Sequence, residues 1–543
     1  MAEVWIVYWV GAGIWALLTH GRLRSFLHIL QLEEYYTPQY VRWLNNYPDR
    51  YLKTMYGALT APLVAALVVA SPGVVGAIAL VGWTLVGAVI VFRRPRIQAK
   101  KPLVMTARAR RVRLTAMALW ILVVVLAKGI ALLVSEPAAV AAGVIAASFF
   151  SAFAGHLLAL ANVLLAPVEA RMRRKFELAA SKKLEQRRPK IIAITGSAGK
   201  TTTKEMVAHL LSARYRVLKT PASFNTPMGI SRTVNDLLAD QDYFVVEMGA
   251  YTKGEIARLC RLVGGTDISV ITTVNAQHLE RFGSIEKTAE AKWEIVEGLR
   301  PGGTAVLNYD VDAVRERGQS LQTAAVLPFG IKSADVPLRA TAVREQEGGI
   351  ELDVAHGDET ATVRVSLLGR HNAGNVLAAL GVGLTCGLDL PYMAAALRQF
   401  HSPDHRLQPL KLPTGGILLD DGYNGNPQGI IGALEVLGAY APKRRILITP
   451  GLIEMGRDKQ RYHAEIGWAA AKNTDIAFLV GPKQTADIRA AMLESGFPES
   501  SLHTTRSLAE ARSMLEEDAI GSANDVILIA NDLPDQFDEY LAI

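Results

Sequence analysis

The chain has 543 residues, which is long for one compact core, so two or three structural units are expected. Half of the residues are hydrophobic and the mean hydropathy is +0.20, with the excess in the first third. The net charge of +7 does not favour nucleic-acid binding, because Lys and Arg gather beside apolar runs, as expected for contacts with anionic lipid headgroups. The only cysteines, Cys260 and Cys386, exclude a disulfide framework and lack zinc-site spacing, so both are expected to be reduced core residues.

The first third contains apolar runs long enough to cross a membrane. Residues 4–19 form a first predicted span, and residues 55–92 form two short helices separated by the Ser-Pro-Gly turn at 71–73. Residues 114–134 and 137–167 complete about five spans, and the last run could also be two shorter helices. The alternative is an apolar helical bundle in a soluble protein, which long uncharged runs with basic flanks make less favourable.

Two basic segments set the predicted topology. Residues 93–113 contain nine Lys or Arg and no acid, and residues 171–190 contain nine more. Positive loops face the cytoplasm, so we expect a multi-pass protein of the inner cell membrane with cytoplasmic catalytic domains. Residues 24–44 mix aromatic, Leu and charged residues, which indicates an interfacial helix or a docking surface. A solvated connector is an almost equally favourable alternative.

The stretch AITGSAGKTTTKEM, residues 193–206, has the order strand, glycine turn and helix start. Backbone N–H groups and a helix N-terminus then face an anion, Lys200 can reach the terminal phosphates of ATP, and the Thr201 hydroxyl can ligate Mg²⁺. A structural glycine turn is the alternative, but it explains neither the lysine nor the threonines. The predicted nucleotide-binding residues of this loop are Gly196, Ser197, Ala198, Gly199, Lys200, Thr201 and Thr202.

Strand-like runs alternate with helix-length segments after the loop. Runs at 243–249, 268–274 and 303–308 predict a doubly wound, mostly parallel sheet with a ligand crevice at the carboxyl ends of its strands. Similar runs after residue 411 predict a second, smaller domain. The expected α/β architecture is therefore a membrane helical region (1–189), a P-loop ATP-binding domain (190–410) and a Rossmann-like domain (411–543).

Eight motifs in chain order make residues 190–467 resemble the Mur ligase family. They are TGSAGKTTTKE, NTPMGI, EMGAYTKGEI, ITTVNAQHLERFGSIEKTAEAKWEI, GRHNAGNVLAAL, HRLQ, LDDGYNGNP and GLIEMGRDKQRYHAEIG. The resemblance is strongest to the branch that joins D-alanyl-D-alanine to UDP-N-acetylmuramoyl-tripeptide, a peptidoglycan precursor. It implies that a substrate carboxylate attacks the γ-phosphate of ATP, and that an amine then displaces phosphate from the acyl phosphate.

The resemblance also implies ligand roles for individual residues. Glu247 and His278 would join Thr201 in holding Mg²⁺, although a surface ion pair for Glu247 and a helix-cap or core role for His278 are the alternatives. Lys292 matches a lysine that is carbamylated in many members, and an ordinary ion pair with Glu290 or Glu294 is its alternative.

The other implied contacts come from four short segments. Asn372 would read adenine or cap a helix, and Arg406 would contact phosphate and brace the transition state. The remaining residues are Asp420 or Asp421 for ribose or the arginine, Tyr423 and Asn424 for the adjoining wall, and Asn225 and Thr226 for the acceptor substrate.

Two departures from the family pattern affect the substrates. Membrane helices replace the domain that holds the UDP-sugar in soluble members, and ILIANDLPDQF stands where a Lys-Gly-Ser motif is expected. We expect an ADP-forming amide ligase that adds D-alanyl-D-alanine or a similar amine to a UDP- or lipid-linked muramyl peptide. The alternatives are a membrane-bound ligase for a poly-amino-acid or another envelope polymer and, from another class, a P-loop membrane ATPase or transporter.

Overall fold

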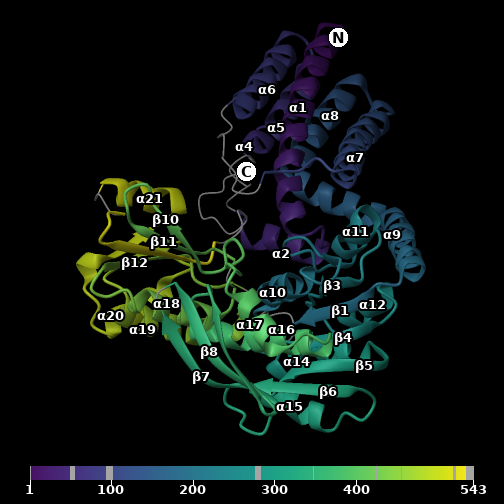
Figure 1. Ribbon diagram of the computed structural model, residues 1–543. Coiled ribbons are helices and arrows are strands. Elements are labelled where there is room, and N and C mark those ends of the chain that lie inside the picture. The colour runs from purple at the N-terminus through teal and green to yellow at the C-terminus, as the bar shows by residue number, and fades with distance from the viewer. Residues whose placement is uncertain are drawn as a thin grey trace. The chain divides into compact units, whose positions relative to one another are not determined.

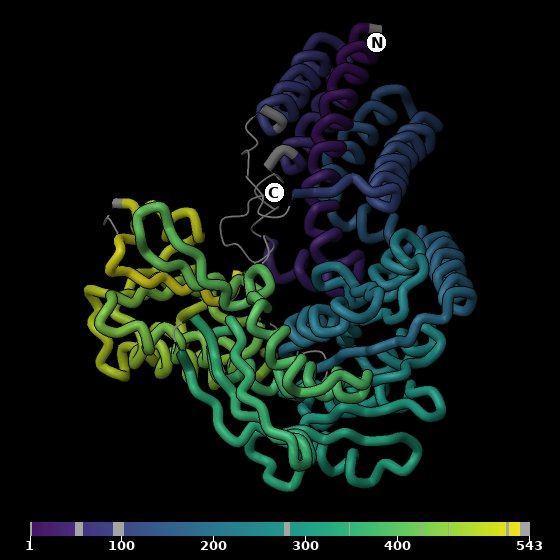
Figure 2. The backbone as a smooth tube through the Cα atoms, in the orientation of Figure 1, coloured from purple at the N-terminus to yellow at the C-terminus, as the bar shows by residue number. Residues whose placement is uncertain are grey.

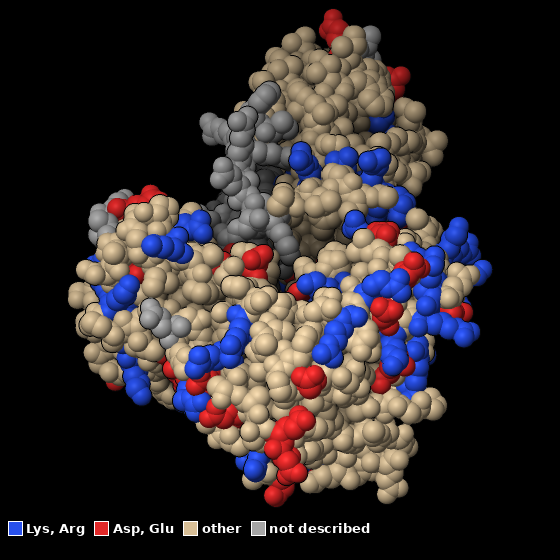
Figure 3. Space-filling view, in the orientation of Figure 1, with Lys and Arg blue, Asp and Glu red and all other residues tan. Residues whose placement is uncertain are grey.

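The computed structural model describes residues 2–48, 56–92, 102–275, 283–346, 348–423, 425–453, 455–517 and 521–532 (Figure 1). The described chain divides into two compact units, a helical unit that ends at Met172 and a sheet unit of residues Arg173–Asp532. Lys, Arg, Asp and Glu are interspersed over the visible face of the sheet unit, whereas the apolar helices of the helical unit show mostly uncharged side chains (Figure 3).

The helical unit consists of helices, most of them apolar. They are α1 (Ala2–Leu32), α2 (Thr37–Asn46), α4 (Tyr56–Leu59), α5 (Ala61–Ala70), α6 (Val74–Phe92), α7 (Ala107–Leu132), α8 (Glu136–Ala152) and the first part of α9 (Ala154–Arg187). The turn between α5 and α6 lies at the predicted Ser-Pro-Gly break. Helix α1 extends well beyond the predicted span at 4–19 and takes up part of the 24–44 segment.

Length and composition identify candidate membrane spans in this unit. Among the described helices, Glu3–Leu32 and Ala107–Leu132 are long and apolar enough to cross a membrane. Helices α8 and α9 meet at 78° and qualify as a third candidate if the bent pair is one span, whereas α5 and α6 are shorter apolar helices. The structure therefore supports two to three long spans by these criteria, and the five-span topology stays a prediction.

The sheet unit contains two sheets, each with helices between its strands (Figure 1). Figure 2 traces the backbone of this unit from teal through green to yellow. The first sheet has the order β2-β3-β1-β4-β5-β6-β7-β8-β9, with parallel pairs from β2 to β7 and antiparallel pairs after β7. Its strands are β1 (Lys190–Thr195), β2 (Val217–Lys219), β3 (Tyr243–Glu247), β4 (Thr266–Ile271), β5 (Leu299–Asn308), β6 (Ala325–Gly330), β7 (Leu338–Gln346), β8 (Gly349–His356) and β9 (Glu359–Val365).

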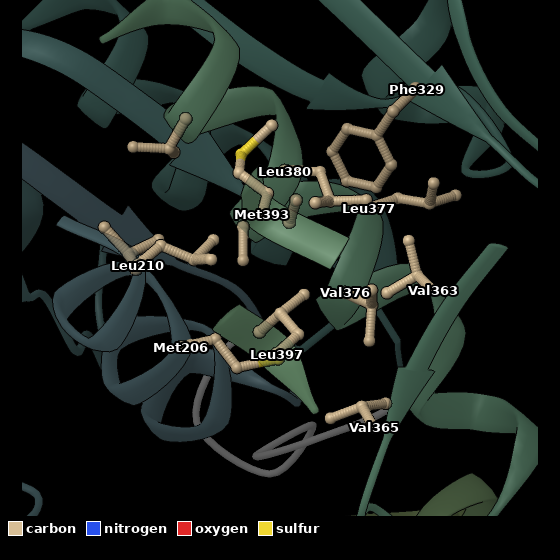
Figure 4. Close-up of a cluster of buried hydrophobic side chains, with 14 of the residues drawn as sticks. Met206, Leu210, Phe329, Val363, Val365, Val376, Leu377, Leu380, Met393 and Leu397 are labelled. Atoms are coloured by element: carbon tan, nitrogen blue, oxygen red, sulfur yellow. The ribbon is translucent and has the colours of Figure 1, made fainter. Parts of the chain in front are cut away.

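Helices connect the parallel strands of this first sheet, and further helices follow its last strand, β9. The connecting helices are α10 (Lys200–Ser212), α11 (Pro227–Leu237), α12 (Glu255–Leu262), α14 (Ile285–Glu297) and α15 (Asp312–Gln319), and those after β9 are α16 (Ala373–Thr385) and α17 (Leu390–Leu397). One apolar core joins α10, α16 and α17 to the sheet, and Met206, Leu377 and Leu397 point into it (Figure 4). Burial of such side chains stabilises by roughly 1.5–3 kcal/mol each, so this core holds α10 against the sheet.

The second sheet has the order β10-β11-β15-β12-β13-β14, and only the β10–β11 pair is antiparallel. Its strands are β10 (Gln408–Lys411), β11 (Ile417–Asp421), β12 (Arg444–Thr449), β13 (Ile476–Val480), β14 (Leu502–Thr505) and β15 (Asp525–Ala530). The helices are α18 (Pro427–Gly438), α19 (Lys459–Asn473), α20 (Ala486–Glu494) and α21 (Leu508–Glu517). The predicted fold class is confirmed: a helical N-terminal region precedes a mostly parallel sheet and a second, smaller parallel sheet.

Candidate active site

A glycine turn connects β1 to α10 and carries most of the predicted phosphate loop. Gly199 has φ +78°, and a Cβ there would lie 1.9 Å from the side-chain oxygen of Asn375. Gly196 is equally confined, because a Cβ would lie 1.9 Å from Thr272 Oγ1. Glycine is therefore required at both positions, by close approach at each and by a left-handed backbone at Gly199.

The segment after β4 braces this turn from the side. Thr272 Oγ1 donates a hydrogen bond of 2.6 Å to the carbonyl of Ala198, and the N–H of Ser197 donates one of 2.8 Å to the carbonyl of Thr273. Because β1 and β4 are neighbours in the sheet, their carboxyl ends hold the loop from two directions.

A cavity of about 500 Å³ lies between the carboxyl end of the first sheet and the start of the second-sheet domain. Several predicted site residues line it together: Ser197, Ala198, Gly199, Lys200, Thr201, Thr202, Asn372, Arg406, Asp421 and Tyr423. Others do not line this cavity, namely Gly196, Asn225, Thr226, Glu247, Lys292 and Asp420. His278 and Asn424 lie outside the described residues.

Two cations reach the cavity from different sides. Lys200 Nζ donates 2.8 Å to the carbonyl of Gly196, and Arg406 donates 2.7 Å to the carbonyl of Tyr423. Burial lowers the pKa of the Lys200 ammonium, the charge of Arg406 lowers it further, and Glu247 opposes the shift. A polyanion in the cavity would relieve the repulsion between the two cations, which is the electrostatic demand of a nucleotide triphosphate.

Oxygen ligands suited to Mg²⁺ lie beside the loop. Thr201 Oγ1 donates a hydrogen bond of 2.9 Å to Glu247 Oε2, so a hydroxyl and a carboxylate meet at one point. Hard oxygen donors are the ligands that Mg²⁺ takes, often with several waters and substrate phosphates, so these two residues fit the ion. No group of three or more His, Cys, Asp or Glu side chains with metal-site geometry occurs among the described residues, which exclude His278.

Of the two residues predicted for the acceptor substrate, Asn225 contacts the same carboxylate and Thr226 does not. Asn225 Nδ2 donates 3.1 Å to Glu247 Oε1, whereas the Thr226 hydroxyl accepts from the N–H of Gly229 and caps α11. Thr226 thus has a helix-capping role whatever else it contacts.

Lys292 lies on α14 and is only 4% exposed. Burial holds the pKa of its ammonium well below the ordinary value, and the positive charge of Lys200 adds to the lowering. A depressed pKa leaves more of the amine neutral at a given pH, and the neutral nitrogen is the nucleophile that reacts with CO₂. The two acids named above as alternative ion-pair partners of Lys292 bond to other groups. Glu290 pairs with Lys253, and Glu294 accepts from the N–H groups of Gly254 and Ala257.

Residues from the second-sheet domain form one connected group. Asp421 Oδ1 accepts a 3.0 Å hydrogen bond from the N–H of Leu407, and Asp420 lies 2.7 Å from His405 Nδ1. The rings of His405 and Tyr423 are 4.8 Å apart. Asp421 therefore holds the backbone just after Arg406, and Asp420 contacts the side chain of the residue just before it.

Asn372, a predicted site residue, donates to the carbonyl of Leu368 and accepts from Asn375. Its side chain makes no capping hydrogen bond to α16, so the helix-cap alternative is wrong.

Sequence reasoning missed residues that the fold brings to this site. His371 and Asn375 line the cavity beside Asn372. Lys204, one helical turn after Lys200, is fully buried against Glu247. The sequence signal that could have identified Lys204 is its position on α10 next to Thr203 and near Met206, which the helix buries.

Two segments of the chain match models of known protein families. Residues 194–383 match the family described as "Mur ligase middle domain", and residues 405–531 match "Mur ligase, glutamate ligase domain". The chain is 32% identical over 318 residues to UDP-N-acetylmuramoyl-tripeptide–D-alanyl-D-alanine ligase of Escherichia coli K12, covering 58% of this chain and 70% of that protein. The chain belongs to the Mur ligase family. It is therefore an ATP-dependent ligase.

Other family members support the same assignment. The enzyme of the same name from Bacillus subtilis is 32% identical over 287 residues, or 52% of this chain and 61% of that protein. The crystal structure of MurF from Acinetobacter baumannii superposes with a TM-score of 0.59 at 25% identity, covering 68% of this chain and 78% of that one. MurF of Thermotoga maritima in complex with ADP gives 0.59 at 23% identity and supports the fold, covering 66% of this chain and 80% of that one.

Proposed function

We propose that this Mur ligase forms an amide bond between D-alanyl-D-alanine, or a similar amine, and a peptidoglycan-precursor carboxylate. The observation that carries the proposal is the cavity into which Lys200 and Arg406 project from two domains, with the Thr201–Glu247 pair beside the phosphate loop. The relatives named as D-alanyl-D-alanine ligases supply the substrate class, and the MurF complex with ADP supports ATP as the nucleotide.

The proposed reaction has two steps, phosphoryl transfer and amide formation. A carboxylate oxygen of the acceptor bonds to the γ-phosphorus of ATP while the bond from that phosphorus to the β–γ bridging oxygen breaks, giving an acyl phosphate and ADP. The amine nitrogen then bonds to the acyl carbon, the carbon–oxygen bond to phosphate breaks, and the proton lost by the amine ends on the departing phosphate. Lys200 and Arg406 stabilise the charge on the transferred phosphoryl group, and closure of the cavity protects the acyl phosphate from water.

Two further groups complete the proposed site. Thr201, Glu247 and His278 would hold Mg²⁺, which supplies charge neutralisation on the phosphates when bound. Carbamylated Lys292 would place an anion where an ammonium would repel Lys200. Asn372 would contact adenine, Asp421 the ribose or Arg406, and Asn225 the acceptor.

The helical unit motivates a membrane location for the reaction. Its two to three candidate spans support a membrane location. The basic segments 93–113 and 171–190 support the proposed orientation, an inner-membrane protein of about five spans with cytoplasmic catalytic domains. A ligase fixed beside anionic lipids is well placed to take a lipid-linked acceptor rather than a soluble UDP-linked one. A ligase for a poly-amino-acid or another envelope polymer is the second candidate, because ILIANDLPDQF stands in place of Lys-Gly-Ser and the exact substrates of the relatives therefore transfer poorly.

The full chain in lipid nanodiscs tests these proposals. Phosphate release from ATP is measured with UDP-linked or lipid-linked muramyl tripeptide and with D-alanyl-D-alanine, glutamate or other amines, and the product is identified by mass spectrometry. We expect release that requires both an acceptor and an amine, fastest with D-alanyl-D-alanine. Equal rates with UDP-linked and lipid-linked acceptors would remove the case for a lipid-borne substrate. Release indifferent to every amine would instead favour a membrane ATPase.

A further inference from the structure

Lys204 is a buried cation that the proposed reaction does not use. It lies on α10 and its side chain is 0% exposed, although an unpaired ammonium is costly to bury. Nζ donates to the carbonyl of Ala222 and lies 3.3 Å from Glu205 Oε1 and 3.9 Å from Glu247 Oε2. The ammonium therefore joins α10, the end of β3 and the 220–226 segment, here called the acceptor loop.

The acceptor loop is held against β3 by several other contacts. Thr220 N–H donates 3.0 Å to the carbonyl of Val245, and the N–H of Gly249 donates 3.1 Å to the carbonyl of Asn225. A Cβ at Gly249 would lie 2.9 Å from the Asn225 side chain, so the loop and the strand end are in close contact.

The middle of the loop depends on a different contact. Ala222 has φ +43°, a left-handed conformation that costs free energy for a residue with a Cβ. Its carbonyl is the one that Lys204 binds. Phe224, two residues further on, is 38% exposed.

We infer that Lys204 is a positioning residue that holds the acceptor loop against Glu247, so that Asn225 and Glu247 face the same reaction centre. The inference rests on the proposed function, because the loop's substrate is the carboxylate acceptor. Lys204 contacts Glu247 and the loop backbone at Ala222, and it does not itself line the nucleotide cavity. Its loss is therefore expected to affect the acceptor more than ATP.

Lys204→Met, which keeps the length of the chain but removes the donor and the charge, tests this. Lys219→Met is the matched control, since Lys219 pairs with Glu205 from the surface and is 45% exposed. The full chain in nanodiscs is treated with chymotrypsin, and cleavage after Phe224 is followed by mass spectrometry. The KM values for the acceptor and for ATP are then measured separately.

We expect Lys204→Met to be cleaved severalfold faster than wild type. Its KM for the acceptor should be about 10-fold higher, at the lower end of the roughly 10- to 100-fold effects seen when a group that orients a ligand is lost. The KM for ATP stays within about twofold, and Lys219→Met matches wild type. Unchanged cleavage with an unchanged acceptor KM overturns the inference, and so does an equal rise in both KM values, which indicates general damage to α10.

Lys204→Gln is a milder second variant, which keeps the inference testable if Lys204→Met does not fold. Its amide is too short to span Ala222 and Glu247, so cleavage faster than wild type but slower than in Lys204→Met is expected. A Gln variant cleaved at the wild-type rate contradicts the inference. If wild type forms no amide with any acceptor, the proposed function fails, whereas the cleavage comparison still tests the contact.

Discussion

The Thr201 hydroxyl at the start of α10 donates a 2.9 Å hydrogen bond to the Glu247 carboxylate at the end of β3. Parallel strands β1 and β3 are neighbours, so the groups that follow their carboxyl ends meet at one edge of the sheet. Residues 46 positions apart thereby provide two hard oxygens next to the phosphate loop.

Glu247→Gln is expected to raise the Mg²⁺ concentration for half-maximal activity by at least about 10-fold, because an amide oxygen is a weaker ligand than a carboxylate. Titration of Mg²⁺ at saturating ATP measures the effect. Glu205→Gln is the control, since Glu205 is an acid of the same region that pairs with Lys204 and Lys219. A Mg²⁺ requirement that is the same in wild type and Glu247→Gln would exclude Glu247 as a ligand.

Lys292→Met is expected to stabilise the folded protein at neutral pH in CO₂-free buffer, by roughly 1–3 kcal/mol, because it removes a buried amine whose charged form burial disfavours. The pKa of Lys292 in the folded state lies well below that of the unfolded chain, roughly 10.4. Between the two values the unfolded chain binds more protons, so the wild-type free energy of unfolding rises with pH there. The advantage of the variant should therefore shrink as the pH approaches about 10.

Thermal unfolding at several pH values measures this, with the exposed Lys287→Met as control. An advantage of Lys292→Met that does not change with pH would contradict the assignment of a depressed pKa. Wild type supplied with ¹³CO₂ should also give a carbamate resonance that Lys292→Met lacks.

Gly432→Ala is expected to destabilise the packing of α18 on His371 by about 1–3 kcal/mol. A Cβ at this position would lie 2.6 Å from His371 Nδ1, and burial lowers the pKa of that imidazole to about 4. His371 precedes Asn372, so the KM for ATP should rise together with the loss of stability. His371→Ala in the same chain should recover part of the stability by removing the clash, and no recovery would place the strain elsewhere.

The sequence was most informative where one physical requirement dominated. Buried parallel strands need apolar runs, so β1, β3, β4, β12 and β13 were predictable from composition, and the glycine turn before Lys200 identified the phosphate loop. The β7–β9 hairpins were not predicted, because strands such as LRATAVREQ expose charged residues and carry only a weak alternation.

Tertiary contacts account for the other omissions. Lysine is rarely buried, so a lysine on a helix suggests an exposed side chain, yet Ala222 and Glu247 compensate for the burial of Lys204. His371 enters the cavity lining because α18 closes over it at Gly432, a contact between distant segments that no local pattern predicts.

The central claim is that ATP bound at the Gly196–Thr201 turn drives amide formation, and Lys200→Ala tests it most directly. Full-length wild type and Lys200→Ala in nanodiscs are compared for amide product by mass spectrometry, with the exposed Lys253→Ala as control. We expect Lys200→Ala to lose activity by at least about 100-fold, because a preorganised cation at the transferred phosphoryl group is removed, while Lys253→Ala keeps wild-type activity. Undiminished amide formation by Lys200→Ala would contradict the account.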